Sequence, residues 1–426
     1  MELKPRYKQT EVGVIPEEWD VRTLASVAEK IMVGIASAAT HAYRTKGIPL
    51  LRNQNIRAGY LDDSDILFVD YEYEKTFRNK RLRTGDLLTA RTGYPGMTCV
   101  VPRTYDSAQS FTTLITRPTP GEVESAFLCS FINSAQGQRF FEQSQIGGAQ
   151  KNVNAGTLRK MPVPVPHPSE QRAIARALSD VDALLGGLDR LIAKKRDLKQ
   201  ATMQQLLTGQ TRLPGFDGEW EKRTLGQLFD FSGGYSASRE QLSSKGHCYL
   251  HYGDIHKSSK SFVDVGVEYQ DIPKLDIPLK KVSPTSLLED GDVVFVDASE
   301  DDEGTSRHVV VVNKASVPFI AGLHTIVAKP KSKELIHAYR RYCFQTSAVR
   351  QQFLFYAVGT KVSGISKTNI AKLTLPLPGT SEQNAIAEVL RDIDAEIAAL
   401  EQRSEKTRSL KQAMMQELLT GKTRLI

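Results

Sequence analysis

One segment of the chain occurs twice, and this repeat limits the possible folds more than any other feature. Residues 169–213 (SEQRAIARALSDVDALLGGLDRLIAKKRDLKQATMQQLLTGQTRL) and 381–425 (SEQNAIAEVLRDIDAEIAALEQRSEKTRSLKQAMMQELLTGKTRL) align without a gap at an offset of 212, and about 26 of the 45 positions are identical. Internal repeats indicate repeated structural units. The fold therefore has to accommodate two copies of one architecture.

Both copies are predicted to form long helices that pair with each other. Their apolar residues alternate at spacings of four and three, which is typical of a coiled-coil seam. The seam residues are Ile174, Leu178, Val181, Leu185, Leu188 and Ile192 in the first copy, and Ile386, Leu390, Ile393, Ile397 and Leu400 in the second. The second seam then turns polar at Ser404, Thr407 and Lys411, which leaves the far end of the helix pair open.

The ends of the two helices also carry sequence signals. Ser169 and Ser381 follow Pro-rich strips (PVPVPHP and LPLPGT) that cannot be helical, so we expect each serine to cap a helix. Gly209 and Gly421 stand where helices favour a C-terminal glycine.

The segments outside the helices correspond more faintly. The pairs are IPEEWDVRTL (15–24) with FDGEWEKRTL (216–225), IPLLRNQNI (48–56) with HCYLHYGDI (247–255), TGDLLTA (84–90) with DGDVVFV (290–296), and SFTTLITRP (110–118) with GLHTIVAKP (322–330). Alternating β-branched and aromatic residues predict strands there. Residues 127–143 and 339–355 predict one shared helix near the end of each domain.

These patterns predict an α+β fold of four parts. Two β-rich domains, 1–160 and 214–372, alternate with two helical spacers, 161–213 and 373–426. The spacers are expected to form an antiparallel coiled coil that separates the domains with a pseudo-twofold relation. Such symmetry would suit two sites on a partner that itself has twofold symmetry. Because the two domains have diverged, we expect those sites to differ.

Composition excludes several classes of protein. No apolar run approaches the roughly 20 residues of a membrane span, and the N-terminus has no apolar signal segment, so no membrane association is expected. The net charge of +7 is weakly indicative of a polyanionic partner. The four cysteines, Cys99, Cys129, Cys248 and Cys343, are widely separated, which fits a reducing cytoplasm.

Motifs for catalysis are missing from the sequence. The ending TGKTRL is similar to a phosphate loop, but the glycine required five residues before Gly421 is Gln416. His247 and His251 would suit a metal only on a helix, and their flanks predict a strand, so no metal site is expected. The stretch SEDDEG (299–304) remains open between an acidic surface loop, a carboxylate metal cluster and an acceptor for a cytosine amino group.

This layout resembles the specificity subunit of a Type I restriction-modification system. The resemblance is carried by the two SEQxxIA…LKQxxMQxLLTG helices and the openings IPEEWDVRTL and DGEWEKRTL, and it covers essentially the whole chain. It implies a non-catalytic protein whose two target recognition domains each bind one half of a split target in double-stranded DNA. The helices would set the spacing and dock methyltransferase subunits.

The resemblance also implies the other components. Restriction and translocase subunits would join through the methyltransferase core, and S-adenosylmethionine, ATP and Mg would bind only to partner subunits, with no cofactor on this chain. The alternative is a two-domain DNA-binding regulator that acts alone and needs no partner surface on its helices.

Several clusters are candidates for DNA contact, because Arg and Lys bind phosphates and amide, carboxylate or aromatic side chains recognise base edges. In the first domain they are Arg52, Asn53, Gln54, Asn55, Lys75, Arg78, Lys80, Arg81, Arg91, Tyr94, Gln150, Lys151, Asn152 and Asn154. In the second they are His251, Tyr252, Asp254, Arg307, His308, Thr360, Lys361 and Ser363. For the basic run, a solvated surface is an equal alternative, and for the Gly-rich loops 147–154 and 359–366 a turn-only role is the alternative.

Overall fold

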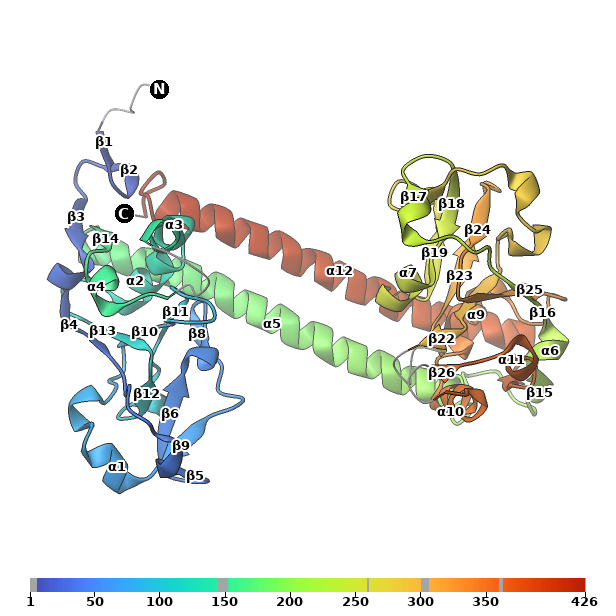
Figure 1. Cartoon of the computed structure of the whole chain (residues 1–426), viewed down its shortest axis with the longest axis horizontal. Helices are drawn as coiled ribbons and strands as arrows, with labels where there is room; N and C mark the ends of the chain where they lie inside the picture. Colours follow the sequence, from blue (N-terminus) through green and yellow to red (C-terminus); the bar gives the residue numbers. More distant parts are fainter. Residues whose placement is uncertain (1–5, 145–151, 259, 300–305, 360–362, 426) are drawn as a thin grey trace. The chain divides into compact units, whose positions relative to one another are not determined.

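The computed structural model describes residues 6–144, 152–258, 260–299, 306–359 and 363–425. Contacts divide the chain into two compact units, of which unit 1 is Met1–Arg190 with Glu401–Ile426 and unit 2 is Leu191–Leu400. Two long helices, α5 (Pro168–Leu206) and α12 (Thr380–Leu418), each contribute a part to both units (Figure 1). This division differs from the four consecutive segments expected from the sequence, because each unit takes the beginning of one helix and the end of the other.

Unit 1 contains, in its described residues, two four-stranded sheets and four short α-helices besides its parts of the long ones. Its strands are β1 (Tyr7–Thr10), β2 (Gly13–Pro16), β3 (Asp20–Thr23), β4 (Ala28–Val33), β5 (Tyr43–Arg44), β6 (Ile48–Arg52), β7 (Ile56–Arg57), β8 (Tyr60–Leu61), β9 (Leu67–Val69), β10 (Leu87–Thr89), β11 (Thr98–Val100), β12 (Gln109–Phe111), β13 (Leu114–Pro118) and β14 (Pro162–Val165). Helix α1 (Tyr71–Lys75) comes directly after β9. Helices α2 (Ser125–Ile132), α3 (Ala135–Ser144) and α4 (Ala155–Arg159) come after β13.

The two sheets of unit 1 have different pairing. One has the order β11-β10-β13-β4 and is antiparallel. The other has the order β12-β6-β9-β5, in which β12 runs parallel to β6. Its pairs β1–β2, β3–β14 and β7–β8 are separate two-stranded ladders. The apolar core lies between α2, α3, the first turns of α5 and the antiparallel sheet, with Trp19, Phe127 and Phe131 fully buried.

Unit 2 repeats this plan. Its strands are β15 (Glu221–Thr224), β16 (Phe229–Gly233), β17 (Leu242–Ser243), β18 (His247–Leu250), β19 (Phe262–Asp264), β20 (Lys274–Leu275), β21 (Val293–Val296), β22 (Ala298–Ser299), β23 (His308–Val312), β24 (Phe319–Ala321), β25 (Thr325–Pro330), β26 (Ser363–Gly364) and β27 (Thr374–Leu377). Its short helices are α6 (Leu225–Leu228), α7 (Tyr252–Lys257), α8 (Val265–Glu268), α9 (His337–Cys343), α10 (Ser347–Tyr356) and α11 (Lys367–Ile370).

The sheet topology of unit 2 matches that of unit 1 with one added strand. The order β16-β25-β21-β23-β19 corresponds to β4-β13-β10-β11, and β19 is the addition. The order β17-β20-β18-β24 corresponds to β5-β9-β6-β12, and β24 again runs parallel to β18. The duplication predicted from the helices therefore extends through the β-rich parts.

Two predictions of secondary structure were wrong in the same way in both copies. Residues 127–143 and 339–355 are each interrupted, giving α2 and α3 in unit 1 and α9 and α10 in unit 2. At the first break the Asn133 side chain bonds to both backbone groups of Thr98, at 3.0 and 2.8 Å, so the chain turns toward the sheet. At the second break Thr346 caps α10 by accepting from Val349 N.

The strand predicted at 110–118 is also interrupted, and the one predicted at 322–330 begins later than expected. Thr112 and His324 have φ of 54° and 57°, the left-handed region that L-residues rarely occupy. β13 and β25 therefore start only after these residues, at Leu114 and Thr325.

The long helices pack antiparallel, because the first turns of one lie with the last turns of the other in both units. In unit 1 the cluster contains Ile174 and Leu178 from α5 with Leu418 from α12. In unit 2 Met203 and Leu206 share a cluster with Ile386 and Leu390. Of the predicted seam residues, Ile174, Leu178, Leu188, Ile192, Ile386, Leu390 and Ile397 are buried, and Val181, Leu185, Ile393 and Leu400 are half-buried.

The polar stretch of α12 continues the seam in unit 1. Ser404 and Thr407 are buried, and Ser404 Oγ donates to Asp189 Oδ1 at 3.3 Å. Lys411 Nζ lies 2.6 Å from Asp182 Oδ1. In unit 2 Lys199 pairs with Asp394 at 2.6 Å, which is the equivalent of the Lys411–Asp182 pair, and Lys195 pairs with Glu396 at 2.5 Å. The change from apolar to polar residues thus leaves the helices paired.

Each long helix is fixed to its own β-rich part by the glutamine of the SEQ motif. Gln171 accepts from Glu124 N and donates to the carbonyls of Glu122 and Pro166. Gln383 accepts from Ile336 N and donates to the carbonyls of Glu334 and Pro378. Both amides are fully buried, so each bond replaces water at a helix start.

Within the described residues, no helix is both long and apolar enough to cross a membrane. All four cysteines are described, and each is buried with a free thiol.

Candidate nucleic-acid interface

Four loops of unit 1 meet at one end of its sheets. Because β12 is parallel to β6, the ends of both strands lie together, at Phe111 and Arg52. The next strand, β13, begins opposite Thr89, the last residue of β10. The loops that follow β6, β10 and β12 are therefore neighbours. The segment before α4 joins them, since Val153 N donates to the carbonyl of Arg91 at 3.2 Å.

Asn53 fastens three of these loops together. Its Oδ1 accepts from Arg91 N at 2.8 Å, and its Nδ2 donates to Thr112 Oγ1 at 3.1 Å. The side chain of a residue after β6 thus holds the residue after β10 and the residue after β12. We call the loops that carry these three residues, with the segment 152–154, the loop end of unit 1.

Unit 2 has the same construction with different side chains. Asp297 follows β21 and occupies the place of Arg91: its carbonyl accepts from Ile365 N at 2.8 Å, and its N–H donates to the carbonyl of His324. His324 Nδ1 lies 3.2 Å from Asp297 Oδ1. The Tyr252 ring meets the His324 ring edge-on, with centroids 5.4 Å apart. We call the loops that carry Tyr252, Asp297 and His324, with the described residues 363–365, the loop end of unit 2.

Backbone strain occurs at the same point of each loop end. Thr112 and His324, the left-handed residues, are equivalent in the repeat and both follow the strand parallel to its neighbour. Left-handed backbone in non-glycine residues is uncommon and concentrates at functional sites. Its repetition in both units supports a function for the loop ends.

The predicted run 52–55 lies at the loop end of unit 1, but its side chains are largely engaged. Arg52 pairs with Asp65 at 2.8 Å, and Gln54 donates to the same carboxylate at 2.9 Å. Asn55 is buried, accepts from Arg52 N and donates to the carbonyls of Asp62 and Asp65. Asn55 therefore stabilises the loop, because its buried amide bonds to the backbone of the loop.

Other candidates of unit 1 lie nearer the surface. Tyr94 is 70% exposed. Arg91 is half-buried, and its Nε has no hydrogen-bond partner in the described part of the chain. Asn152 is exposed, while Asn154 caps α4 by accepting from Thr157 N at 2.8 Å. Gln150 and Lys151 lie outside the described residues.

Most of the basic run is tied to neighbouring groups. Lys75 pairs with Glu72 at 2.5 Å, and Arg81 binds both oxygens of the buried Glu74 at 2.6 Å. The Arg81 hydrogen bonds lower the pKa of Glu74. Lys80 donates to the carbonyl of Gly34, which lies against the turn at Thr112, and Arg78 is exposed.

The candidates of unit 2 divide between the loop end and the core. His251 is buried, caps α7 by accepting from Gly253 N, and stacks on Tyr252 with centroids 4.5 Å apart. Burial lowers its pKa. Asp254 pairs with Arg239 at 2.9 Å. Tyr252 stays half-exposed and at the centre of the loop end.

His308 lies in the core, where its predicted contact with DNA is not supported. It is buried between the rings of Phe295 and Phe344, and burial lowers its pKa to about 4. Arg307 donates to the carbonyl of His256 and is half-buried. Ser363 pairs with Ser299 in the ladder β22–β26. Thr360, Lys361 and the acidic stretch 300–304 lie outside the described residues.

Sequence reasoning missed Asp297, His324 and Thr112. Their strands were aligned correctly, so the equivalence of Thr112 with His324 was available in SFTTLITRP and GLHTIVAKP. The convergence of their loops was not, because it depends on parallel pairing between strands distant in sequence. The expected strand at 247–255 also ends at Leu250 and is followed by α7.

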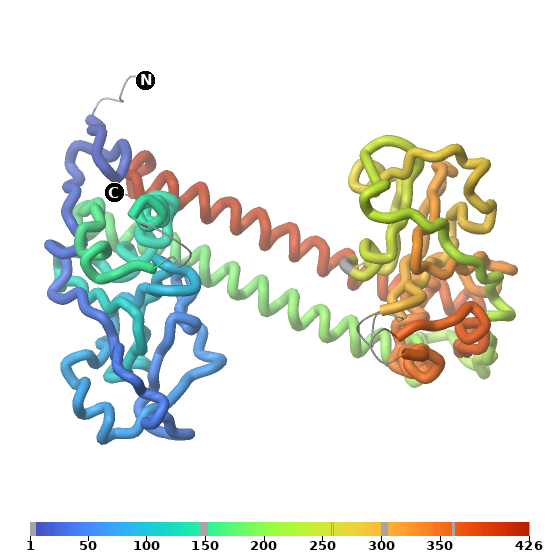
Figure 2. Tube along the Cα trace, in the orientation of Figure 1, coloured from blue at the N-terminus to red at the C-terminus, as the bar shows by residue number. Residues whose placement is uncertain are grey.

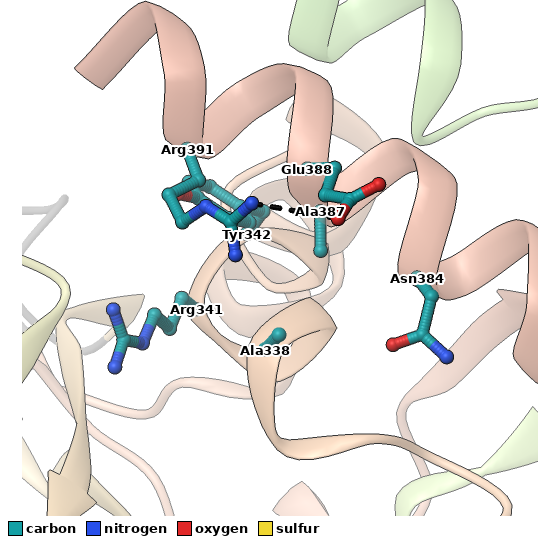
Figure 3. Close-up of a pocket in the computed structure, with 7 residues that line it drawn as sticks. All are labelled: Ala338, Arg341, Tyr342, Asn384, Ala387, Glu388 and Arg391. Atoms are coloured by element: carbon teal, nitrogen blue, oxygen red, sulfur yellow. Dashed lines mark ion pairs between the residues drawn. The ribbon is translucent and has the colours of Figure 1, made fainter. Parts of the chain in front are cut away.

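A small pocket in unit 2 lies away from the loop end. It occupies about 150 Å³ between α9 and α12, and Figure 3 shows Ala338 and Arg341 of α9 across from Asn384 and Glu388 of α12. Arg391 pairs with Glu388 at 3.5 Å. Cofactor pockets usually exceed about 300 Å³. No three metal-ligating side chains gather in the described ranges. The loop ends therefore remain the candidate interface.

Comparison with known proteins identifies the family. Residues 16–193 and 217–408 each match the family model described as Type I restriction modification DNA specificity domain. The chain belongs to this family. As a specificity subunit of a type I restriction-modification system, it is a non-catalytic component, and its two matches coincide with the two copies of the repeated architecture.

Relatives of the specificity subunit match it over nearly its full length. A Methanocaldococcus jannaschii chain named as the MjaX type I restriction enzyme specificity subunit is 23% identical over 440 residues, which cover 98% of this chain and 97% of that one. The crystal structure of the S subunit from M. genitalium has a TM-score of 0.56 at 13% identity and covers 98% of both chains. A chain of a type I R-M system solved for its complex assembly and conformational transition also has a TM-score of 0.56, at 18% identity, and covers 96% and 99%. These two structures share the fold of this subunit.

Proposed function

We propose that this specificity subunit binds an asymmetric bipartite target in double-stranded DNA, with one half-site for each loop end. The observation that carries the proposal is the repeated frame with different side chains. Asn53, Arg91 and Thr112 in unit 1 stand where Tyr252, Asp297 and His324 stand in unit 2. The same frame gives both units the same way of meeting DNA, and the different side chains give them different sequences to recognise.

We also propose that the paired helices dock methyltransferase subunits. Leu198 on α5 and Leu410 on α12 are equivalent in the repeat and are 50% and 56% exposed. Each lies on the helix face away from the buried seam. One such leucine stands in each unit, so each unit can offer the same apolar contact to one methyltransferase copy. Exposed apolar side chains at equivalent places favour a protein partner.

The remaining components follow from this assembly. Restriction and translocase subunits would attach through the methyltransferase core, and S-adenosylmethionine, ATP and Mg would bind to partner subunits. The whole complex would act in the cytoplasm, where genomic DNA lies and where four free thiols stay reduced.

The test is to co-express the subunit with its methyltransferase partner, purify the complex and sequence the methylated positions in DNA. We expect a stable complex and one bipartite motif with two different halves. Exchanging loop 147–154 with 359–366 should change one half and leave the other. Calorimetry on the subunit alone should show no binding of S-adenosylmethionine.

Leu198→Glu and Leu410→Glu test the partner surface. Each should reduce co-purification of the methyltransferase, while Val267→Glu, at an 81% exposed apolar side chain on α8, is the matched control and should not. A wild-type subunit that binds its target without any methyltransferase, and never co-purifies with one, would support a regulator acting alone. A palindromic motif would contradict the proposed asymmetry of the target, and methylation without a defined motif would contradict the bipartite target itself.

A further inference from the structure

Arg91 of unit 1 and Asp297 of unit 2 are equivalent in the repeat and carry opposite charges. Each is a half-buried residue just after β10 or β21, and its carbonyl accepts a hydrogen bond from the residue before the N-cap of α4 or α11. Val153 N donates to Arg91, and Ile365 N donates to Asp297. The backbone frame is therefore shared, and only the side chain differs.

A contact to phosphate does not explain this difference. DNA presents the same anionic backbone to both units, so a phosphate-binding position should carry a cation in both. Asp297 is an anion and is 35% exposed at the loop end. A carboxylate facing a polyanion is repelled unless it accepts hydrogen bonds from a group on the DNA. The exposed donors that a base edge offers in the major groove are the amino groups.

The partners of the two side chains fit base contact. His324 Nδ1 lies 3.2 Å from Oδ1 of Asp297, and the His324 ring also meets the Tyr252 ring edge-on. In unit 1 the backbone of Arg91 is fixed by Asn53, while the Nε of its guanidinium has no partner in the described residues. This Nε is itself a buried atom, so contact with a base would use the outer N–H groups of the guanidinium fork, a geometry that suits a pair of acceptors.

We propose that Arg91 and Asp297 are equivalent base-recognition residues with opposite hydrogen-bonding sense. Arg91 donates to O6 and N7 of a guanine in one half-site, and Asp297 accepts from the N4 amino group of a cytosine in the other. This inference rests on the proposed function, since it requires both loop ends to face DNA. It adds which residue of each unit selects a base and which base it selects.

The test measures methylation of a duplex library, randomised in both half-sites, by the complex of the subunit with its methyltransferase. Asp297→Asn keeps an oxygen to accept from His324 but offers a donor in place of one acceptor. It should lower the preference for cytosine at one position of one half-site by about 10- to 100-fold, the range of one good base contact. The other half-site should be unchanged.

Arg91→Lys separates base contact from phosphate contact in unit 1. Lysine keeps the charge but loses the bidentate fork. Discrimination for guanine should fall about 10-fold or more while overall affinity for DNA stays close to that of the wild type. If Arg91→Lys kept the full discrimination for guanine, or if Arg91→Ala weakened binding equally on all sequences, Arg91 would be a phosphate contact and the inference would fail.

Asp230→Asn is the charge-matched control for Asp297→Asn. Asp230 is an exposed carboxylate that pairs with Lys331 at 3.2 Å, outside the loop end. Its removal changes the net charge equally and should leave both half-sites unchanged.

If Asp297→Asn only strengthened binding to every sequence alike, Asp297 would act through charge and the inference would be overturned. In that case the wild-type complex would still methylate a bipartite motif. Failure of the proposed function itself would appear as a wild-type complex without a motif.

Discussion

The indole Nε1 of Trp19 donates a hydrogen bond of 3.0 Å to Oε2 of Glu170, which ties the start of the first β-rich part to the start of α5. Glu170 also binds Arg424, from beyond the end of α12, at 2.5 and 2.9 Å. The equivalent residues of unit 2 repeat the arrangement: Trp220 donates to Glu382 at 3.0 Å, and Arg212 binds Glu382 at 2.6 and 2.7 Å. Each unit therefore joins a domain, the beginning of one helix and the segment after the other.

Removing either glutamate should destabilise the protein. Glu170 and Glu382 side chains are 2% and 4% exposed, while their arginines are 24% exposed. Glu170→Ala and Glu382→Ala would each leave an indole N–H without its acceptor and a partly buried guanidinium without its buried carboxylate partner. We expect a loss of about 3 kcal/mol in the free energy of unfolding, measured by urea denaturation. Glu388→Ala, at a 68% exposed side chain, is the control and should change it by less than about 0.5 kcal/mol. Equal effects of all three would contradict this role.

The buried His308 should make unit 2 sensitive to acid. Its pKa is about 4 in the folded protein and about 6.5 in the unfolded chain, because burial disfavours the charged ring. Between these values the unfolded state binds more protons, so this contribution to stability is complete above about pH 6.5 and is lost as the pH falls toward 4. The loss should reach about 3 kcal/mol at most. Denaturation at pH 7 and pH 5 should show a smaller difference for His308→Leu than for the wild type. An identical difference would show that His308 does not titrate in this way.

Two glycines of α5 weaken the helix. An added Cβ would meet nothing within 4 Å at Gly187 and only the Arg190 guanidinium, at 3.5 Å, at Gly186. Ala398 and Ala399 occupy the equivalent places in α12. The double change to alanine should raise the free energy of unfolding by about 1–2 kcal/mol and leave the methylated motif unchanged. Gly137→Ala is the contrasting variant: its Cβ would collide with the carbonyl oxygen of Ile132, and it should destabilise the protein.

The N-terminal and C-terminal segments meet in unit 1, which predicts that the chain tolerates circular permutation. Tyr7 Oη donates to the carbonyl of Gly421 at 2.9 Å, and Figure 2 shows the first strands beside the end of α12. Met1 and Ile426 themselves lie outside the described residues. Joining the ends through a short linker and reopening the chain between Leu213 and Phe216, at an exposed turn, should preserve folding and the methylated motif. An insoluble product or a changed motif would contradict the prediction.

Much of the helical architecture was predictable from the sequence because its signals are local. Pro-rich strips, seam periodicity and terminal glycines placed the helices within a few residues of Pro168–Leu206 and Thr380–Leu418. Gly209 and Gly421 have positive φ, as a helix C-terminus requires. The repeat also predicted that the β-rich parts share one topology. These features depend on residues a few positions apart, whose propensities act within one turn or one strand.

The candidate site was predicted less completely, because tertiary contacts decide which side chains reach the surface. The sequence marks Arg52, Asn55, Arg81 and His308 as candidates by residue type. In the fold, however, Arg52 pairs with Asp65, Arg81 pairs with Glu74, and Asn55 and His308 are buried. The sequence gives no sign that Asp297 lies beside His324, because β21 and β25, the strands next to these residues, pair only in the assembled sheet. Local patterns determined two helices and two similar domains. Packing between strands far apart in the chain decided where the loops meet, because hydrogen bonds and charge pairs of that kind form only after the sheets have assembled.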